Sequence, residues 1–509
     1  MQRHGLRAAL ALTGSLGFAL SCAPREVSVA VEVEKGGACD YGATPDSDAR
    51  VCANGHSCEP VQGGTGEYVC AVPVIIRGQV FDALSGDALG GALITALDRT
   101  SAPVSDVTVS DATGAYELEV VALRDSDGEI ADDAIYTLQA FAADYAPFPF
   151  GVRPALPVST ADGVIETVPG EDADDDGQPD DTERLVIETP TTEVALIPLS
   201  DADAGGGTIH GSISDADGSQ LPAGTLVIAE GGGAPAPYGL ADRSGEFTIF
   251  NVPPGTVSIA GYRTGIELAP VSVDVAAGTT HEVELTVAAH GDALASVSGT
   301  ANIVNAPGGS STSVVLVPSA VFNEPLERGP VPYGLRAPGP GIEVNVSGTF
   351  TISQVPAGTY KVLAAFENDD LVRDPDATIA GTQIQEITVA SGEAATVAEN
   401  FKVTEALAVV RPGSEAPEGI SGDPTFEFAD DSSEDRYIVV VYDALGDLVW
   451  EKTDVPGVSG SETVEVPYEG PALISGMWYQ FWATSVRDKQ GEETRISRTE
   501  DLRGVFFAQ

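Results

Sequence analysis

The stretch IRGQVFD at residues 76–82 returns as IHGSISD at residues 209–215 and, in a weaker form, as VSGTA at residues 297–301. Apolar and polar residues alternate in the first two copies, which is the period-2 pattern of a half-buried β-strand. Because the three copies are well separated along the chain, they predict successive copies of one structural unit.

Each copy is followed by a turn and a second strand that carries an aromatic residue. We expect the Asp and Gly of this segment to shape a tight turn and the aromatic side chain to fill the core. The three segments are DATGAYEL at 111–118, DRSGEFTI at 242–249 and VSGTFTI at 346–352. The second and third copies also share VPPGTV at 252–257 with VPAGTY at 355–360, and PYGL at 237–240 and 332–335.

At these residues the chain resembles carboxypeptidase regulatory-like domains, a transthyretin-like β-sandwich family. Gly78, Val80 and Asp82, with the turn at 111–116, carry the match in the first copy, and the second copy fits well. The third copy departs in its opening strand and lacks the Asp before Gly348. The resemblance covers roughly residues 72–404 and implies binding or spacer modules without catalytic residues.

Residues 406–509 follow a different pattern. YIVVVYD at 437–443 predicts a strand, and the spacing from Leu473 through Gly476 and Tyr479 to Ala483 resembles the tyrosine corner of fibronectin type III and immunoglobulin-like sandwiches. We expect a linker at 412–419 and a hinge at 204–207.

The predicted fold class is therefore all-β, with several β-sandwich domains in tandem after a lipoprotein signal and a small disulfide-rich module. The expected divisions are a signal peptide (1–21), a lipidated tether (22–37), a disulfide-rich module (38–71), a first regulatory-like sandwich (72–203) with a calcium-loop insertion (171–184), a second (208–290), a divergent third (293–404) and a fibronectin type III or immunoglobulin-like sandwich (406–509).

The acidic charge of the chain argues against nucleic-acid binding and against electrostatic docking on anionic lipid. The chain has 509 residues, with 25 Lys and Arg against 77 Asp and Glu, for a formal net charge of -52. A nucleic-acid-binding protein needs a basic footprint, and electrostatic docking on anionic lipid needs one too. The 43% hydrophobic content still suffices for folded cores.

The amino terminus resembles a bacterial lipoprotein signal. Arg3 and Arg7 precede an apolar run at 8–20, which is too short to span a bilayer and is followed by Ser21 and Cys22. Ordinary signal cleavage is the alternative. Lipidation of Cys22 would account for the odd cysteine and supply a membrane anchor. Ala23, in place of Asp, implies by resemblance sorting to the outer membrane, with the periplasmic or external side left open.

The other four cysteines lie within a segment too short to bury a sufficient core, so we predict two disulfides. Zinc is the alternative, but closely spaced ligand pairs are missing. Three pairings are possible, and we favour Cys39 with Cys58 and Cys52 with Cys70.

The segment DADDDGQPDDTE at 172–183 matches the twelve-residue calcium loop in ligand types and in its Gly at the sixth position. Pro179 and the flanking strand pattern exclude an EF-hand, and the segment resembles the loops of thrombospondin type 3 repeats. A solvated acidic insertion is the alternative. The predicted calcium ligands are Asp172, Asp174, Asp176, Gln178, Asp180 and Glu183.

Enzyme signals are poor, and we predict no enzymatic activity. The chain contains neither G-x-S-x-G nor a P-loop, and we interpret its isolated histidines, including His210, as solvated surface residues. Trp478 and Trp482 should face outward if Tyr479 and Phe481 face the core, and two exposed indoles can bind a sugar or a protein partner. Packing against a neighbouring strand or domain is the alternative.

The resulting hypothesis is a non-catalytic, outer-membrane lipoprotein that acts as a multidomain binding or scaffolding module. Two alternatives remain: an accessory subunit of an outer-membrane transport or secretion assembly, and a hydrolase with an unrecognised site.

Calcium should bind the loop at 172–183 with a dissociation constant of about 10⁻⁴–10⁻³ M, as in extracellular modules. The double substitution Asp174→Ala with Asp176→Ala should abolish binding, because it removes two carboxylate ligands. Titration calorimetry with CaCl₂ measures this, and heat retained in the double variant would place calcium elsewhere.

Overall fold

The computed structural model confirms the all-β prediction. Its regular elements are strands, apart from short 3₁₀ segments, in the part of the chain that it describes. The described residues are 31–41, 49–53, 55–99, 101–170, 181–214, 222–303, 312–340, 346–366, 371–373, 384–398, 400–431, 434–458, 463–489, 492–500 and 503–509.

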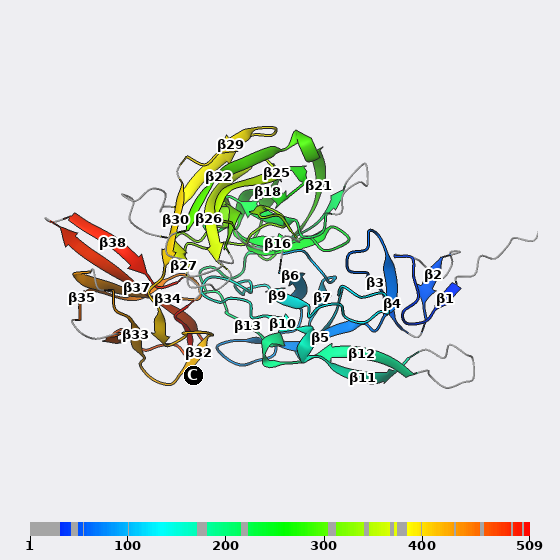
Figure 1. Ribbon diagram of the computed structural model, residues 1–509, viewed down its shortest axis with the longest axis horizontal. Coiled ribbons are helices and arrows are strands. Elements are labelled where there is room, and N and C mark those ends of the chain that lie inside the picture. Colours follow the sequence, from blue (N-terminus) through cyan, green and yellow to red (C-terminus); the bar gives the residue numbers. More distant parts are fainter. Residues whose placement is uncertain are drawn as a thin grey trace, which may run out of the picture.

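The strands fall into a small amino-terminal module and four larger units (Figure 1). The module contains β1 (Val31–Val33), β2 (Arg50–Cys52), β3 (Ser57–Pro60) and β4 (Tyr68–Ala71). The first unit contains β5 (Val74–Asp82), β6 (Leu93–Asp98), β7 (Thr108–Val109), β8 (Ala115–Val120), β9 (Ile135–Phe141), β10 (Val158–Ser159), β11 (Val164–Pro169), β12 (Asp181–Ile187) and β13 (Val194–Leu196), with η1 (Thr160–Asp162) and η2 (Pro190–Thr192).

The second unit contains β14 (Gly207–Ser214), β15 (Leu226–Glu230), β16 (Tyr238–Leu240), β17 (Glu246–Val252), β18 (Gly255–Arg263), β19 (Ile266–Ala269), β20 (Val271–Val275) and β21 (Thr280–His290), followed by η3 (Gly291–Ala293). The third contains β22 (Ala295–Ile303), β23 (Thr312–Pro318), η4 (Ser319–Val321), β24 (Arg336–Ala337), β25 (Gly348–Val355), β26 (Gly358–Phe366), β27 (Leu371–Arg373), β28 (Gln385–Val389), β29 (Ala394–Thr396) and β30 (Phe401–Glu405).

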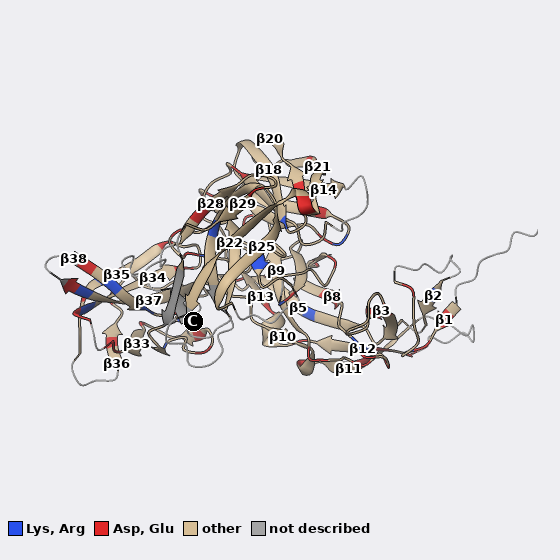
Figure 2. Cartoon of the chain, turned by 45° about the horizontal axis from the view of Figure 1, so that its top comes forward, with Lys and Arg blue, Asp and Glu red and all other residues tan. Residues whose placement is uncertain are grey.

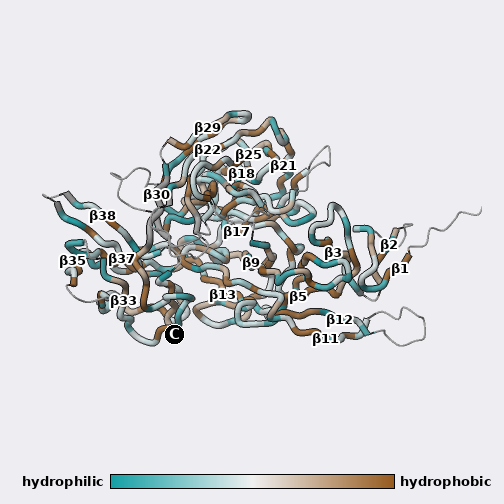
Figure 3. The backbone as a smooth tube through the Cα atoms, viewed as in Figure 1, coloured by the Kyte–Doolittle hydropathy of each residue, from teal (hydrophilic) through white to brown (hydrophobic). Residues whose placement is uncertain are grey.

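The fourth unit contains β31 (Val409–Arg411), β32 (Glu418–Ile420), β33 (Thr425–Ala429), β34 (Arg436–Asp443), β35 (Leu448–Pro456), β36 (Thr463–Pro467), β37 (Trp478–Lys489), β38 (Glu492–Arg498) and β39 (Val505–Ala508). Hydropathy changes repeatedly along these strands instead of forming long apolar blocks (Figure 3). This pattern suits strands that bury one face and expose the other.

The first three units share a strand arrangement, as the internal repeats predict. In each, the opening strand pairs antiparallel with the strand after the turn and parallel with a later strand. These pairings are β5 with β8 and β13, β14 with β17 and β21, and β22 with β25 and both β29 and β30. The first and third units divide their strands between two sheets. The second unit has one sheet, in which β16 and β17 are the two end strands, and these two strands contact each other.

In all three units a glycine on the opening strand lies directly opposite the aromatic residue of the second strand. The pairs are Gly78 with Tyr116, Gly211 with Phe247 and Gly299 with Phe350. A Cβ atom on Gly299 would lie 2.6 Å from Cζ of Phe350, so the ring occupies the space that a side chain would need. The aromatic residue is buried in each case, and it sets the register of the central strands.

The turn before the aromatic residue is held by an aspartate in the first two units. Asp111 Oδ1 accepts hydrogen bonds from the amides of Thr113 and Ala115, at 2.7 and 3.1 Å. Asp242 Oδ1 accepts from the amides of Ser244 and Glu246, both at 2.9 Å. These contacts are the Asx-turn geometry expected from the sequence.

The cysteine module confirms both predicted disulfides, Cys39–Cys58 and Cys52–Cys70. It begins earlier than expected, because β1 pairs with β2 inside the segment assigned to a tether. Glu59 joins the module to the first unit, since its carboxylate accepts a hydrogen bond from the Ala122 amide at 3.1 Å. Burial raises the pKa of the Glu59 carboxyl.

The second and third units pack against each other through a shared hydrophobic cluster, beside which the second unit keeps a separate core of its own. The rings of Tyr262 and Tyr360 meet edge-on, with centroids 5.8 Å apart, and the Arg263 guanidinium lies 5.0 Å from the centroid of the Tyr333 ring. The shared cluster includes Leu226, Ile228 and Tyr238 of the second unit with Val297, Leu316, Tyr360 and Val362 of the third.

The predicted hinge at 204–207 is wrong, because hydrogen bonds and close backbone contacts hold this segment in place. The Gly205 amide donates to Asp144 Oδ1 at 2.6 Å, and the Asp144 amide donates to Asn251 Oδ1 at 2.6 Å. A Cβ on Gly206 would lie 2.6 Å from the carbonyl carbon of Asn251. Gly206 therefore allows two backbone segments to pack closely, and it does not act as a flexible hinge.

The predicted linker at 412–419 likewise belongs to the fourth unit, since β32 pairs with β39 in its sheet and the Gly504 amide donates to the Gly413 carbonyl at 2.9 Å. The tyrosine-corner contact is present, with the Ile474 amide donating to the Tyr479 hydroxyl at 2.8 Å. The core of this unit also contains Val152 and Ile197 of the first unit.

Gly299→Ala should lower the free energy of unfolding by about 1–3 kcal/mol, because the added methyl group meets the Phe350 ring in a filled core. The cost should shrink in a Phe350→Leu background. Thermal melting of the full chain measures both, with Gly339→Ala as the control, since nothing lies within 4 Å of a Cβ placed there. Equal losses for Gly299→Ala and Gly339→Ala would contradict the prediction.

Candidate functional site

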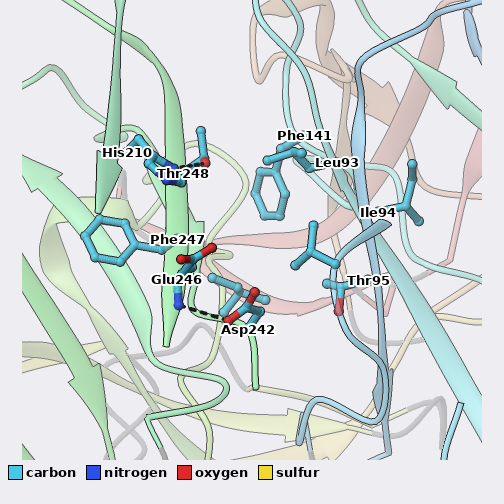
Figure 4. A pocket seen from close by; sticks show the side chains of 11 residues that line it. Leu93, Ile94, Thr95, Phe141, His210, Asp242, Glu246, Phe247 and Thr248 are labelled. Carbon is cyan, nitrogen blue, oxygen red and sulfur yellow. Dashed lines mark hydrogen bonds between the residues drawn. The ribbon is translucent and has the colours of Figure 1, made fainter. Parts of the chain in front are cut away.

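A cleft of about 180 Å³ lies where the first unit meets the second (Figure 4). One wall comes from β6 and β9 of the first unit, and the other from β14, β16 and β17 of the second. The lining residues are Leu93, Ile94, Thr95, Val107, Phe141, His210, Leu240, Asp242, Glu246, Phe247 and Thr248.

His210 occupies the polar side of this cleft. It lies opposite Thr248 on β17 and opposite Glu282 on β21, so the three residues form a row across the sheet. Its Nδ1 atom lies 3.1 Å from Thr248 Oγ1. The His210 side chain is half-buried, because the first unit covers the face that strand alternation directs outward.

Acidic groups surround the same histidine. Asp242 and Glu246 line the cleft, and a shallower hollow on the adjoining face contains His210 with Glu246, Glu282 and Glu284. Figure 2 shows red acidic positions in this part of the molecule, where β21 carries Glu282 and Glu284. An apolar wall beside convergent carboxylates suits a ligand that combines a cationic or hydrogen-bond-donating group with an apolar part.

This cleft was not predicted from the sequence. The alternation in IHGSISD places His210 on the solvent side of its strand, and no local pattern shows that β6 and β9 of another unit cover that side. The repeated PYGL segment at 237–240, which supplies Leu240, is the sequence feature that comes nearest to indicating this cleft.

The predicted calcium ligands lie mostly outside the described residues. Asp172, Asp174, Asp176, Gln178 and Asp180 fall in the gap at 171–180, and Glu183 is exposed on β12. Strands β11 and β12 form an antiparallel hairpin whose last registered pair is Pro169 with Asp181. The acidic segment therefore connects the two strands of a hairpin, and calcium binding stays a prediction.

Cys22 also lies outside the described residues. Within the described part of the chain, Cys39, Cys52 and Cys58 form the one group of three potential metal ligands whose atoms lie within 4.8 Å of one another. All three belong to the two disulfides. No helix among the described residues is long and apolar enough to cross a membrane.

The prediction that Trp478 and Trp482 form an exposed binding face is wrong for Trp482. Tyr479 and Phe481 do face the core, but Trp482 is only 6% exposed. The Arg498 guanidinium lies 4.9 Å from the centroid of its ring. Trp478 is half-buried and stacks on Phe507, with ring centroids 5.4 Å apart.

The third unit covers this face of β37. Gln480, between the two tryptophans, accepts a hydrogen bond from Arg328 at 3.0 Å, and Arg498 forms an ion pair with Glu327. The face is thus an interface within the chain, as the packing alternative anticipated.

No family model matches the chain, and no curated protein matches it. Among solved structures, the Bacillus anthracis TIE protein is 11% identical, with 85% of this chain and 72% of that chain covered and a TM-score of 0.15. A streptococcal ancillary pilin is 12% identical over 65% of this chain and 99% of that chain, with a TM-score of 0.16. The shaft pilin SpaA from Lactobacillus rhamnosus GG is 12% identical over 43% and 98%, with a TM-score of 0.14. TM-scores this low assign no function.

Trp482→Ala should lower the free energy of unfolding by about 3–5 kcal/mol, because it leaves a cavity beneath Arg498 and beside Tyr442. Trp478→Ala should cost clearly less, since that ring is half-buried. Guanidinium denaturation of the full chain, followed by circular dichroism, compares the two variants. A greater loss for Trp478→Ala would reverse the assignment of the buried ring.

Proposed function

We propose that this protein is an exported, lipid-anchored and non-catalytic scaffold that presents binding clefts at the junctions between its units. The observation that carries this proposal is the shared packing of the units. Part of the second unit packs into the hydrophobic core of the third, and the core of the fourth incorporates buried residues of the first and third, including Val152, Ile197 and Leu326. Packing of this kind holds the inter-unit clefts at a constant shape.

The lipid anchor would act through the cysteine module. Strand β1 starts shortly after Cys22 in the sequence, and the module lies at one end of the molecule (Figure 1). A lipid on Cys22 would therefore hold the module near the bilayer and leave the sandwich units farther out. The two disulfides suit the oxidising compartment that export provides.

The finer domain assignments belong to the same proposal. The first three units would be carboxypeptidase regulatory-like sandwiches, supported by their common strand pairing and their glycine–aromatic contacts. The fourth would be a fibronectin type III or immunoglobulin-like domain, supported by the Tyr479 contact. Calcium bound at 172–183 would neutralise the acidic connection between β11 and β12.

The partner would be a carbohydrate or a protein, and its binding site would be the cleft beside His210 instead of the tryptophan face. Asp242 and Glu246 on the rim favour a partner group that donates hydrogen bonds or carries positive charge. The apolar wall of Leu93, Phe141 and Leu240 would bury the adjoining part of the partner.

Cys22→Ala should move the protein from the membrane fraction to the soluble fraction, because it removes the site of acylation. Cell fractionation with immunoblotting measures the distribution. Ala23→Asp is the matched control, since it keeps the cysteine and should leave the protein membrane-bound while altering its sorting between membranes. Unchanged membrane association of the Cys22→Ala variant would remove the anchor from the proposal.

A further inference from the structure

A second cavity, of about 190 Å³, lies at the junction of the first three units. The first unit contributes Gln139 and residues 149–151 and 153–155, the second contributes Tyr238, and the third contributes Val321, Asn323 and the segment 328–330. The cavity is separate from the cleft beside His210, which has no lining residue in common with it.

The charge of its lining is unusual for this chain. Asp and Glu outnumber Lys and Arg by 77 to 25, yet the residues that line this cavity include two arginines, Arg153 and Arg328, and no acid. Proline, alanine, valine and phenylalanine side chains supply the remaining walls, at Pro149, Phe150, Pro154, Ala155, Val321 and Pro330.

Arg153 is the central group. It is only 1% exposed, and it is the largest of the fully buried side chains in the described part of the protein. Its two terminal nitrogens donate to the Ala195 carbonyl at 2.6 Å and to the Pro147 carbonyl at 2.9 Å, while its Nε atom has no hydrogen-bond partner. Its guanidinium also lies 5.5 Å from the centroid of the Phe148 ring.

These contacts leave the charge of Arg153 uncompensated. Carbonyl oxygens and an aromatic face stabilise a guanidinium only partly, and a buried charge without a counter-ion is costly. No carboxylate within the described residues forms an ion pair with Arg153. Burial lowers its pKa to about 9, and the one titratable group that acts on it is the neighbouring Tyr238.

Other polar groups converge on the same space. Tyr238 is 8% exposed and carries a hydroxyl that can donate to an oxyanion. Arg328 is held in place by contacts that include donation to the Gly151 carbonyl at 3.2 Å and to Gln480 Oε1 at 3.0 Å. Gln139 also lines the cavity, and its amide Nε2 can donate hydrogen bonds.

We propose that this junction cavity binds a small organic carboxylate, with its oxygens at Arg153, Arg328 and Tyr238 and its apolar part against the proline and valine walls. A carboxylate is favoured over a fully polar anion such as sulfate because much of the lining is apolar. Since residues of three units line the cavity, an occupied site would also hold those units together. This inference is independent of the lipid anchor and of the cleft beside His210.

The test uses the full chain and two probes of similar shape, benzoate and its neutral counterpart benzamide, in chloride-free buffer. Isothermal titration should show benzoate binding at least 10-fold more tightly than benzamide, and benzoate should raise the melting temperature. Tyr238→Phe should weaken benzoate binding several-fold without loss of the fold. Equal affinities for the two probes, or no binding of either, would overturn the proposal.

Gln139→Glu supplies a second, independent readout, because it places a carboxylate inside the cavity. This variant should melt at a higher temperature than the native chain and should no longer bind benzoate. Gln79→Glu, on the exposed face of β5, adds the same charge to the surface and should change neither property. A Gln139→Glu variant that melts lower than Gln79→Glu would show that Arg153 needs no counter-ion and would overturn the proposal.

Discussion

An aromatic ring seated over a glycine on the neighbouring strand is the contact on which the first three units depend. Gly78, Gly211 and Gly299 carry no Cβ. The rings of Phe247 and Phe350 occupy the space beside Gly211 and Gly299, and the Tyr116 hydroxyl with the Thr192 carbonyl occupies it beside Gly78. A shift of one residue in either strand would direct the ring away from the core and place a side chain against its neighbour. The contact thus couples the register of two central strands to the filling of each core.

Packing between the units then makes a single body from these repeated elements. The second and third units bury apolar residues in one cluster, and Asn251 of the second unit binds the backbone of the first through Asp144, Ala142 and Tyr145. Flexible connections were expected between the units, but hydrogen bonds and close backbone contacts hold these segments. A rigid arrangement can maintain clefts whose two walls belong to different units, as both cavities described above require.

The packing of the units also places one arginine, Arg153, in a site without acidic neighbours. Acidic residues outnumber basic ones by 77 to 25, and Figure 2 shows them in many strands and loops, whereas Arg153 lies at a junction that no acid lines. Arg153 is only 1% exposed there, and no carboxylate among the described residues forms an ion pair with it. Arg153 is therefore unusual because of its burial between units and not because of its local sequence.

Much of the architecture could be predicted from local patterns, because strand alternation, Asx turns and the tyrosine corner are set by neighbours in the sequence. Asp111, Asp242 and Tyr479 make the contacts that their motifs indicate. The sequence predicted two disulfides but left three pairings possible, and the structure contains the favoured one. Which outward-facing residues remain exposed was decided only by the tertiary structure. His210 alternates away from its own core but lines a cleft whose other wall is the first unit, and Trp482 is buried beside Tyr442 and Arg498, next to the face of β37 where Arg328 of the third unit binds Gln480. The physical reason is that alternation specifies the two faces of a strand, while burial of the outer face depends on units far away in the sequence.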